Sequence, residues 1–530
     1  MGYLKLSTIL AIGKRYWVRI ILVIILLVSF GLMIFSARSD SLVVDEKVHL
    51  TAGYLHVWQG DYTFNREHPP LLNDLAGLFA KLARPNLPKV SLADFKGEDQ
   101  WQYGDLFFYH SGNDVEKLIF FSRLPFIFLA LGLIYLVFIW AREVFGPKAG
   151  LMAAALVGFC PNILAHGRLA TTDAVAFFYL LAVWLLRKYI FKASWINAVL
   201  LGIGLALVIL AKFSGIIILP VLGLGLLYFW LVKRPRILQA LGQLLIILVT
   251  ALVLSWLVYL FSMRGELSSP VLLAPIHKFI QGYNILADHN RVGHWNYLNG
   301  QISFAGWWYY FPLVLGYKLT LPSLILFGMA LIFGFYAIKR KFIEEFLLIF
   351  PGGLFLVMAM TSHIDIGIRH ILPVLPFLYI FISRLANLKD IFLRPIVAGL
   401  LILHVAAGIL AYPNYIAYFN QIAGGPNGGI NHLIDSNLDW NQNMKRFAAY
   451  AKAQNIKEVY TYCWDLESFQ YYGVKAQFLP TKPVKGVVVI CAHQLKIKYD
   501  YDFSWVEKYP FDDVIAQGLY IWRFDQKPVQ

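Results

Sequence analysis

The sequence predicts an all-α polytopic membrane protein with a small C-terminal α/β extracytoplasmic domain. Of its 530 residues, 59% are hydrophobic, and the mean hydropathy is +0.61. Apolar runs of 16 to 26 residues recur as far as residue 412, and a soluble core needs no such runs. After residue 412 the runs become shorter and mixed with polar residues, which is typical of a folded domain outside the lipid.

The membrane spans follow from apolar length and charged flanks. We expect about 11 transmembrane helices, because a helix needs roughly 20 apolar residues to cross the hydrocarbon core. The first span follows Lys14, Arg15 and Arg19 and has no small-residue cleavage site before Asp40, which indicates a retained anchor. The predicted spans are residues 17–36, 118–140, 149–164, 173–187, 196–211, 215–232, 237–262, 309–337, 345–361, 369–386 and 395–412.

Charge in the short loops predicts the orientation. With the N-terminus in the cytoplasm, eighteen Lys and Arg residues fall on the cytoplasmic side, among them Lys339, Arg340 and Lys341. The short turns on the other side hold only Arg168, Lys212 and Arg369. Cytoplasmic loops retain such cations, so we expect a multi-pass protein of the plasma (inner) membrane with an extracytoplasmic C-terminus. This asymmetry also explains the net charge of +15 without nucleic acid as a partner.

Two long external loops and the tail hold most of the polar residues. The loops are residues 37–117 and 263–308, where we expect external juxtamembrane helices. Residues 1–412 would form the membrane module and residues 413–530 the extracytoplasmic α/β domain. The tail has a helix-like stretch and three strand-like runs. They are residues 440–453, Glu458–Cys463, Gly486–Cys491 and Gly518–Phe524.

The chain has three cysteines, and Cys160 lies in a predicted span. Cys463 and Cys491 are therefore the only pair able to form an external disulfide. Two cysteines on neighbouring strands are more often unpaired small hydrophobes, so we expect them to be free.

Acidic residues follow the first span. Asp45 and Glu46 are adjacent, so their side chains point in different directions, and one can face a reaction centre while the other supports it. A carboxylate at a membrane edge suits a general base acting on an acceptor hydroxyl or amine. The alternative is a solvated acidic edge of the loop.

Two further motifs carry ionisable groups. In Glu67-His68-Pro69-Pro70 the prolines fix the backbone and hold the acid and the histidine at the start of a helix, although a purely structural turn is the alternative. Residues 167–173 place Arg168 and Asp173 on the turn before the fourth span, where Asp173 would also gain from the helix dipole.

Cations at the outer membrane boundary form a second set. A phosphate at the bilayer surface needs such groups, Arg for forked hydrogen bonds and Lys as a point charge. Each side chain could equally extend to lipid head groups. The set comprises Arg123, Lys212, Arg291, Lys318 and Arg369.

These motifs, together with the Gly306-Trp307-Trp308-Tyr309-Tyr310 run before Lys318, resemble the GT-C glycosyltransferases. The similarity is to protein O-mannosyltransferases (glycosyltransferase family 39) and lipid A aminoarabinose transferases over residues 1–412. The tail, with Asp435-Ser436-Asn437-Leu438-Asp439-Trp440-Asn441, resembles bacterial phospholipid-carrier-dependent members. Trp295 and the aromatic run suit either an interfacial belt or sugar stacking.

The resemblance implies transfer of one sugar, hexosyl or pentosyl, from a polyprenyl-phosphate carrier to a protein, lipid or glycan acceptor, with inversion. Asp45 would be the base, Glu46 its support and Asp173 a second acid facing the sugar. Donor and phosphate binding would fall to Glu67, His68, Arg123, Arg168, Lys212, Lys318 and Arg369.

The sequence is also compatible with other functions. Asp45, Glu46, His49, Glu67 and His68 include possible ligands for a divalent metal, but their spacing is not diagnostic, and we expect no obligatory metal. A lipid-linked sugar transporter or flippase would need ionisable residues near the bilayer midplane and repeated spans. An oligosaccharyltransferase-like enzyme and a polymer-binding scaffold are the remaining alternatives.

Overall fold

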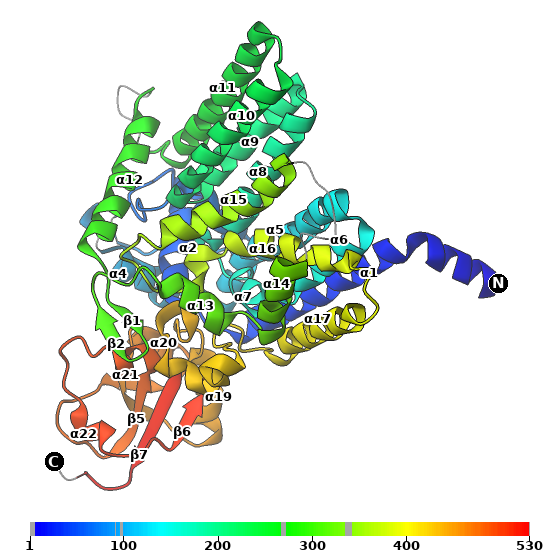
Figure 1. Cartoon of the computed structure of the whole chain (residues 1–530). Helices are drawn as coiled ribbons and strands as arrows, with labels where there is room; N and C mark the ends of the chain where they lie inside the picture. The colour runs from blue at the N-terminus through cyan, green and yellow to red at the C-terminus, as the bar shows by residue number, and fades with distance from the viewer. Residues whose placement is uncertain (1–5, 91, 96–98, 267–271, 334–341, 529–530) are drawn as a thin grey trace, which may run out of the picture.

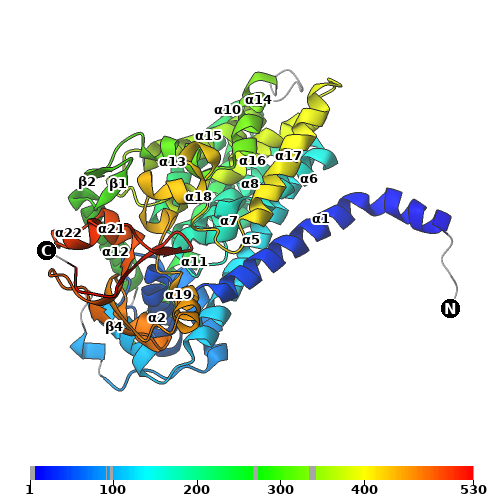
Figure 2. The same ribbon diagram turned by 90° about the horizontal axis from the view of Figure 1, so that it is seen from below.

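The computed structural model describes residues 6–90, 92–95, 99–266, 272–333 and 342–528. The predicted cytoplasmic cations Lys339, Arg340 and Lys341 and residues 334–337 of the eighth predicted span lie outside these ranges. A helical module forms most of the molecule, and a small sheet domain lies at one end (Figure 1). The N-terminal part of the first helix extends away from the module (Figures 1 and 2).

Every predicted span coincides with apolar helix. Among the described residues, seven helices are long and apolar enough to cross a membrane, and α13 with α14, bent by 115°, counts as an eighth if the pair is one span. Three shorter apolar helices, α6, α9 and the one that begins with α16, account for the rest. The helices are α1 (Leu6–Ser39), α5 (Val115–Phe145), α6 (Pro147–Gly158), α8 (Val175–Phe191), α9 (Trp195–Ala211), α10 (Ile218–Lys233), α11 (Ile237–Ser262), α13 (Tyr310–Lys318), α14 (Leu321–Phe333), α15 (Phe342–Ala359), α16 (Val374–Ile382) and α17 (Leu393–Leu410).

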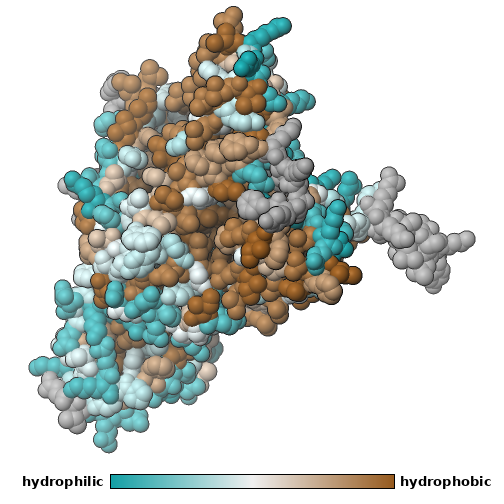
Figure 3. Space-filling model, in the orientation of Figure 1, coloured by the Kyte–Doolittle hydropathy of each residue, from teal (hydrophilic) through white to brown (hydrophobic). Residues whose placement is uncertain are grey.

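The outer helices present apolar side chains to their surroundings. Leu252 of α11 and Ile402 of α17 are exposed, and hydrophobic residues cover much of the helical module, whereas hydrophilic ones dominate the sheet domain (Figure 3). A helix that is apolar on its outward face requires lipid rather than water. The chain is therefore a multi-pass membrane protein, as the sequence predicted.

The first long loop folds into helices α2 (Val44–Gln59), α3 (Pro70–Ala80) and α4 (Gln100–Asp105). Pro69 has an extended backbone and Pro70 begins α3, as the sequence predicted. Gly53 and Gly77 let α2 and α3 approach closely, because a Cβ on Gly53 would lie 1.7 Å from the carbonyl oxygen of Asn73. This crossing fixes the start of α2 relative to the Glu67-His68 turn.

The second long loop contains α12 (Ala274–Val292) and a hairpin of β1 (Asn296–Leu298) and β2 (Gln301–Ser303). The hairpin strands were not predicted, because three-residue strands carry too little alternation to detect. The hairpin lies beside the C-terminal domain (Figure 1).

The C-terminal domain is built on a five-stranded mixed sheet with the order β4-β3-β5-β7-β6. The predicted strands and helix are present, while β4 and β6 at the edges were missed. The domain has a hydrophobic cluster of its own, and Met444 is the first residue of the chain that belongs to it. The elements are α19 (Met444–Ala453), β3 (Glu458–Tyr462), α20 (Leu466–Tyr471), β4 (Lys475–Phe478), β5 (Gly486–Cys491), α21 (Ala492–Lys496), α22 (Ser504–Glu507), β6 (Asp513–Ile515) and β7 (Leu519–Phe524).

Residues 413–443, although part of the tail, pack on the membrane module. Lys318 Nζ donates to the carbonyl oxygens of Ile416 at 2.7 Å and Asn437 at 2.6 Å. The side-chain amide of Asn420 donates to the carbonyl oxygens of Gly316 and Leu319. Lys318 therefore serves the junction between the two parts of the chain.

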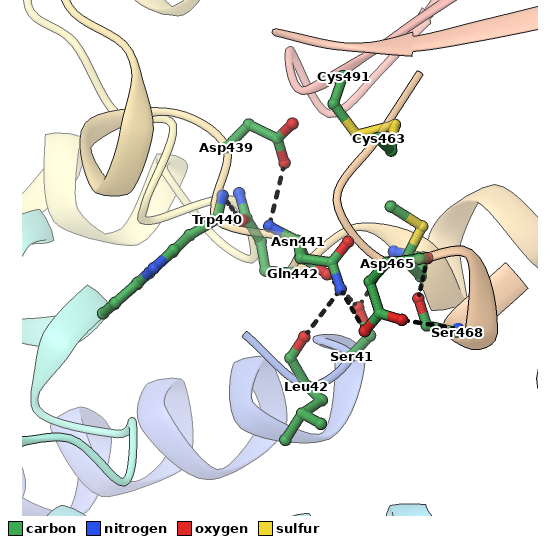
Figure 4. The surroundings of a disulfide bond; sticks show 11 residues. Ser41, Leu42, Asp439, Trp440, Asn441, Gln442, Cys463, Asp465, Ser468 and Cys491 are labelled. Atoms are coloured by element: carbon green, nitrogen blue, oxygen red, sulfur yellow. Dashed lines mark hydrogen bonds between the residues drawn. A yellow bond between two sulfur atoms is a disulfide. The ribbon is translucent and has the colours of Figure 1, made fainter. Parts of the chain in front are cut away.

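Cys463 and Cys491 form a disulfide, so the expectation that they are free is wrong. Strands β3 and β5 pair in parallel, with Tyr462 opposite Ile490. Cys463 directly follows β3 and Cys491 is the last residue of β5, so the shared register brings the two sulfur atoms together (Figure 4).

Candidate active site

A cavity of about 590 Å³ lies between the first long loop, α12 and the loop before α16. One part of its wall is polar and includes Asp45, His49, Glu67, His68, Lys212, Arg369 and His370. Another part is apolar and includes Phe213, Ile216, Ile217, Leu286, Phe355 and Met358. The apolar part comes from the ends of α12 and α15 and from the residues just before α10, so the cavity adjoins the membrane-spanning helices.

Asp45 and Arg369 form an ion pair at the wall of this cavity. Arg369 Nη1 donates to Asp45 Oδ2 at 2.8 Å, and the side chain of Asp45 is 27% exposed. Asp45 stands in the first turn of α2. The carboxylate is thus held from one side and open to the cavity on another.

Glu46 has a different environment, although it follows Asp45 directly. It is completely buried, and Arg123 donates to its two oxygens from Nε at 2.8 Å and from Nη2 at 2.6 Å. The backbone N–H groups of Val43 and Ala170 also donate to Glu46. Glu46 and Arg123 therefore fix α2 on α5 and do not line the cavity. Glu46 thus holds the helix that carries Asp45, while Arg123 lies away from the cavity wall.

Two more predicted phosphate ligands, Arg168 and Lys318, are also occupied by the protein. Arg168 pairs with Asp40, and both side chains are 1% exposed. Lys318 is buried against the carbonyl groups named above. Neither residue lines the cavity, so neither is placed to bind a phosphate there.

Arg291, of the same predicted set, is 81% exposed and pairs with Asp288 on its own helix, α12. Like Arg168 and Lys318, it is absent from the residues that line the cavity. Lys212 and Arg369 are thus the two predicted cations that the structure brings together there.

Lys212 lines the cavity, and Asp173 lies behind it. Lys212 Nζ is 3.7 Å from Asp173 Oδ1, and Asp173 is 1% exposed. Thr171 Oγ1 donates to Asp173 Oδ2 at 3.0 Å. Burial lowers the pKa of Lys212, and the attraction of Asp173 acts against this shift. Asp173 is therefore placed beside the lysine and not on the cavity wall, and its expected role as a second acid facing the sugar stays a prediction.

Five histidines line the cavity. From the sequence, His68 had been assigned to the donor site and His49 named as a possible metal ligand. The rings of His49 and His68 lie 4.9 Å apart. Burial lowers the pKa of His49 and lowers that of His68 well below the usual value, which favours the neutral imidazole of both. His49 Nδ1 is 2.9 Å from Asn73 Oδ1. Neutral imidazoles can donate and accept hydrogen bonds without adding charge. The set is His49, His68, His289, His294 and His370.

Glu67 is held by amides at the same wall. Its Oε1 accepts from Asn65 Nδ2 and from Gln100 Nε2, each at 3.1 Å. Within the described residues, no group of three or more His, Cys, Asp and Glu side chains is placed to hold a metal ion.

The aromatic run, residues 307–310, does not line the cavity. Trp308 is 68% exposed and Tyr310 is buried. The backbone N–H of Trp307 donates to Asp365 Oδ2 at 2.7 Å, and burial raises the pKa of Asp365 to about 7. The exposed members fit an interfacial belt.

Comparisons with known proteins agree with this architecture. A sequence model of the family described as dolichyl-phosphate-mannose-protein mannosyltransferase matches residues 114–259. No curated protein sequence matches the chain. The structure is similar to ArnT from Cupriavidus metallidurans bound to undecaprenyl phosphate, with 14% identity and a TM-score of 0.51, covering 94% of this chain and 97% of that one. In the apo state of the same protein the values are 14% and 0.52, with 96% and 98% covered.

A weaker likeness is to an oligosaccharyltransferase of Archaeoglobus fulgidus, with 15% identity, a TM-score of 0.46, and 94% of this chain and 73% of that one covered. The protein therefore has the GT-C fold of membrane glycosyltransferases. Within that class it is similar to the protein mannosyltransferases in sequence over residues 114–259 and to ArnT in fold, as the resemblance predicted.

Proposed function

We propose that this protein moves a single sugar from a polyprenyl-phosphate carrier to an acceptor on the extracytoplasmic face of the membrane. One observation carries the proposal: a single cavity has both a polar wall with Asp45, Lys212 and Arg369 and an apolar wall continuous with the membrane helices. A polyprenyl phosphate has the same division, since its tail must stay in lipid while its phosphate and sugar need polar partners.

Arg369 and Lys212 would hold the carrier phosphate. An arginine offers several donors in one plane, and a lysine adds a compact charge. When the bond between sugar and phosphate breaks, negative charge grows on the phosphate, and fixed cations stabilise that charge more in the transition state than in the ground state. Asp173 would keep the lysine directed at the cavity.

Asp45 would act as the base. Its Oδ2 accepts from Arg369, and its partly exposed carboxylate keeps acceptor positions for the proton of an incoming hydroxyl or amine. Direct attack of that acceptor on the anomeric carbon, on the side opposite the phosphate, inverts the configuration. The neutral histidines and Glu67 would supply hydrogen bonds to sugar hydroxyls.

The test is turnover of purified protein in nanodiscs with a panel of radiolabelled polyprenyl-phosphate sugars. Asp45→Asn should keep the fold and reduce turnover about 100-fold or more, because general-base catalysis contributes about that much. Asp61→Asn is the matched control, since Asp61 belongs to the same external segment but accepts from the backbone of Thr63 outside the cavity. Full turnover by Asp45→Asn would exclude it as the base.

The same experiment separates the alternatives. A flippase would move the carrier between leaflets without cleaving the bond between sugar and phosphate. An oligosaccharyltransferase-like enzyme would label asparagine side chains of a peptide acceptor. A scaffold would bind a polymer and leave every carrier intact.

A further inference from the structure

The segment Asp435–Gln442 of the tail, called the 435–442 segment below, contacts the start of α2. Its Trp440 carbonyl accepts from Val44 N at 3.1 Å, and the Gln442 carbonyl accepts from Ser41 N at 3.0 Å. The hydroxyl of Ser41 donates to the carbonyl of Asn441 at 2.7 Å. These bonds hold the residues just before Asp45. Figure 4 shows Asn441 and Gln442 of this segment beside Ser41 and Leu42.

The same segment also contacts the loop that carries Arg369. Ser436 Oγ accepts from Arg369 Nε at 3.1 Å and donates to the Ile366 carbonyl at 2.7 Å. Asn437 Oδ1 accepts from Ile368 N at 3.0 Å. The guanidinium carbon of Arg369 lies 4.2 Å from the centre of the Trp440 ring.

We propose that the 435–442 segment is a positioning element of the active site, in which Ser436 and Trp440 orient Arg369 for the donor phosphate. This inference rests on the proposed function, because the phosphate is the ligand that Arg369 would bind. The segment joins both members of the ion pair, which come from positions 45 and 369, so the tail completes the site rather than merely covering it.

The physical reason lies in the arginine side chain. A free arginine has many rotamers, and ordering it on binding lowers affinity. The hydroxyl of Ser436 fixes Nε, Asp45 fixes Nη1, and the Trp440 face fixes the plane through a cation–π contact. Trp440 is 2% exposed, so the contact is shielded from water. The guanidinium is therefore oriented before the ligand arrives.

A double-mutant cycle distinguishes positioning from a merely structural role. The measured quantity is the affinity for undecaprenyl phosphate in nanodiscs. Ser436→Ala should weaken binding about tenfold, as expected for loss of a hydrogen bond to a charged group. In the Arg369→Lys background the same change should add no loss, because lysine has no Nε–H for the hydroxyl to fix. An equal loss in both backgrounds, or none in the wild type, would overturn the inference.

Ser383→Ala is the control, since Ser383 is buried and donates one hydrogen bond, to Ile380, in another part of the module. It should leave binding unchanged. If Ser436→Ala does not fold, Trp440→Phe and Trp440→Leu replace it in the cycle. Phenylalanine should preserve binding and leucine should weaken it, and equal binding by the two would count against the inference.

Hydrogen exchange separates this inference from the proposed function. If the wild type binds no polyprenyl phosphate, the proposed function fails. The contact itself still predicts faster amide exchange in residues 366–370 of Ser436→Ala than of Ser383→Ala. Unchanged exchange there would reject the positioning role independently of any ligand.

Discussion

Replacement of Glu46 by Gln should destabilise the protein much more than replacement of its neighbour Asp45 by Asn. Glu46 accepts four hydrogen bonds, two of them from Arg123, and both side chains are fully buried. Gln retains the shape but leaves the guanidinium of Arg123 without its buried counter-charge. Breaking such a pair by changing one partner costs about 3–5 kcal/mol.

Asp45→Asn breaks a pair in which the acid is 27% exposed. Solvent screening limits such a pair to about 1 kcal/mol. The expected difference between the two variants is therefore about 2–4 kcal/mol. The double variant Glu46→Leu/Arg123→Leu should recover part of the loss, because it removes both buried charges together.

The assay is denaturant unfolding of the purified proteins in mild detergent, followed by tryptophan fluorescence, with turnover measured separately under stabilising conditions. Glu46→Gln should lose stability and retain turnover in the folded fraction, whereas Asp45→Asn should show the reverse. Equal stability of the two variants would refute the assignment of structure to Glu46 and chemistry to Asp45.

Two further predictions concern the C-terminal domain. Burial raises the pKa of Asp439 to about 7 from 3.8, so the folded state binds more protons than the unfolded state between these values and stability falls as pH rises. Relative to Asp439→Asn, the wild type should lose about 3 kcal/mol of unfolding free energy between pH 5 and 8, and parallel pH profiles would contradict this. Cys463→Ser should lower stability by about 3.5 kcal/mol, because Cys463 and Cys491, separated by 28 positions, close a loop in the unfolded chain. Reductant should destabilise the wild type and not this variant, and an equal response of both would contradict the prediction.

The membrane module is predictable from the sequence because bilayer thickness dictates the length of its apolar runs. The Pro69-Pro70 turn is predictable for a similar reason, since proline restricts the backbone whatever surrounds it. The three longer strand-like runs of the tail carry enough pattern to be found. Short edge strands such as β4 and β6 have too few residues to show such a pattern.

The site is only partly predictable. Arg123 and Arg369 both look like cations at the membrane boundary in the sequence. In the structure Arg123 forms a buried ion pair with Glu46, which is distant in the chain, whereas Arg369 lines the cavity. Asp45 and Glu46 also differ because of their distant partners, since Glu46 pairs with buried Arg123 and Asp45 pairs with Arg369 at the cavity wall. Ser436 and Trp440 belong to the tail motif that carried the family resemblance, but no role in the site could be assigned to them from the sequence, because their contacts are made more than 60 residues away. The disulfide depended on strand register, which spacing does not reveal.

The contacts of the 435–442 segment bear on how the protein is made. Asp45 is synthesised early and Arg369 late, and the segment that holds both follows every membrane helix in the described part of the chain. A nascent chain that ends before residue 435 has the two charged residues but lacks Ser436 and Trp440 beside them. In a nascent chain the ion pair can thus gain these contacts only after residue 442 has been synthesised.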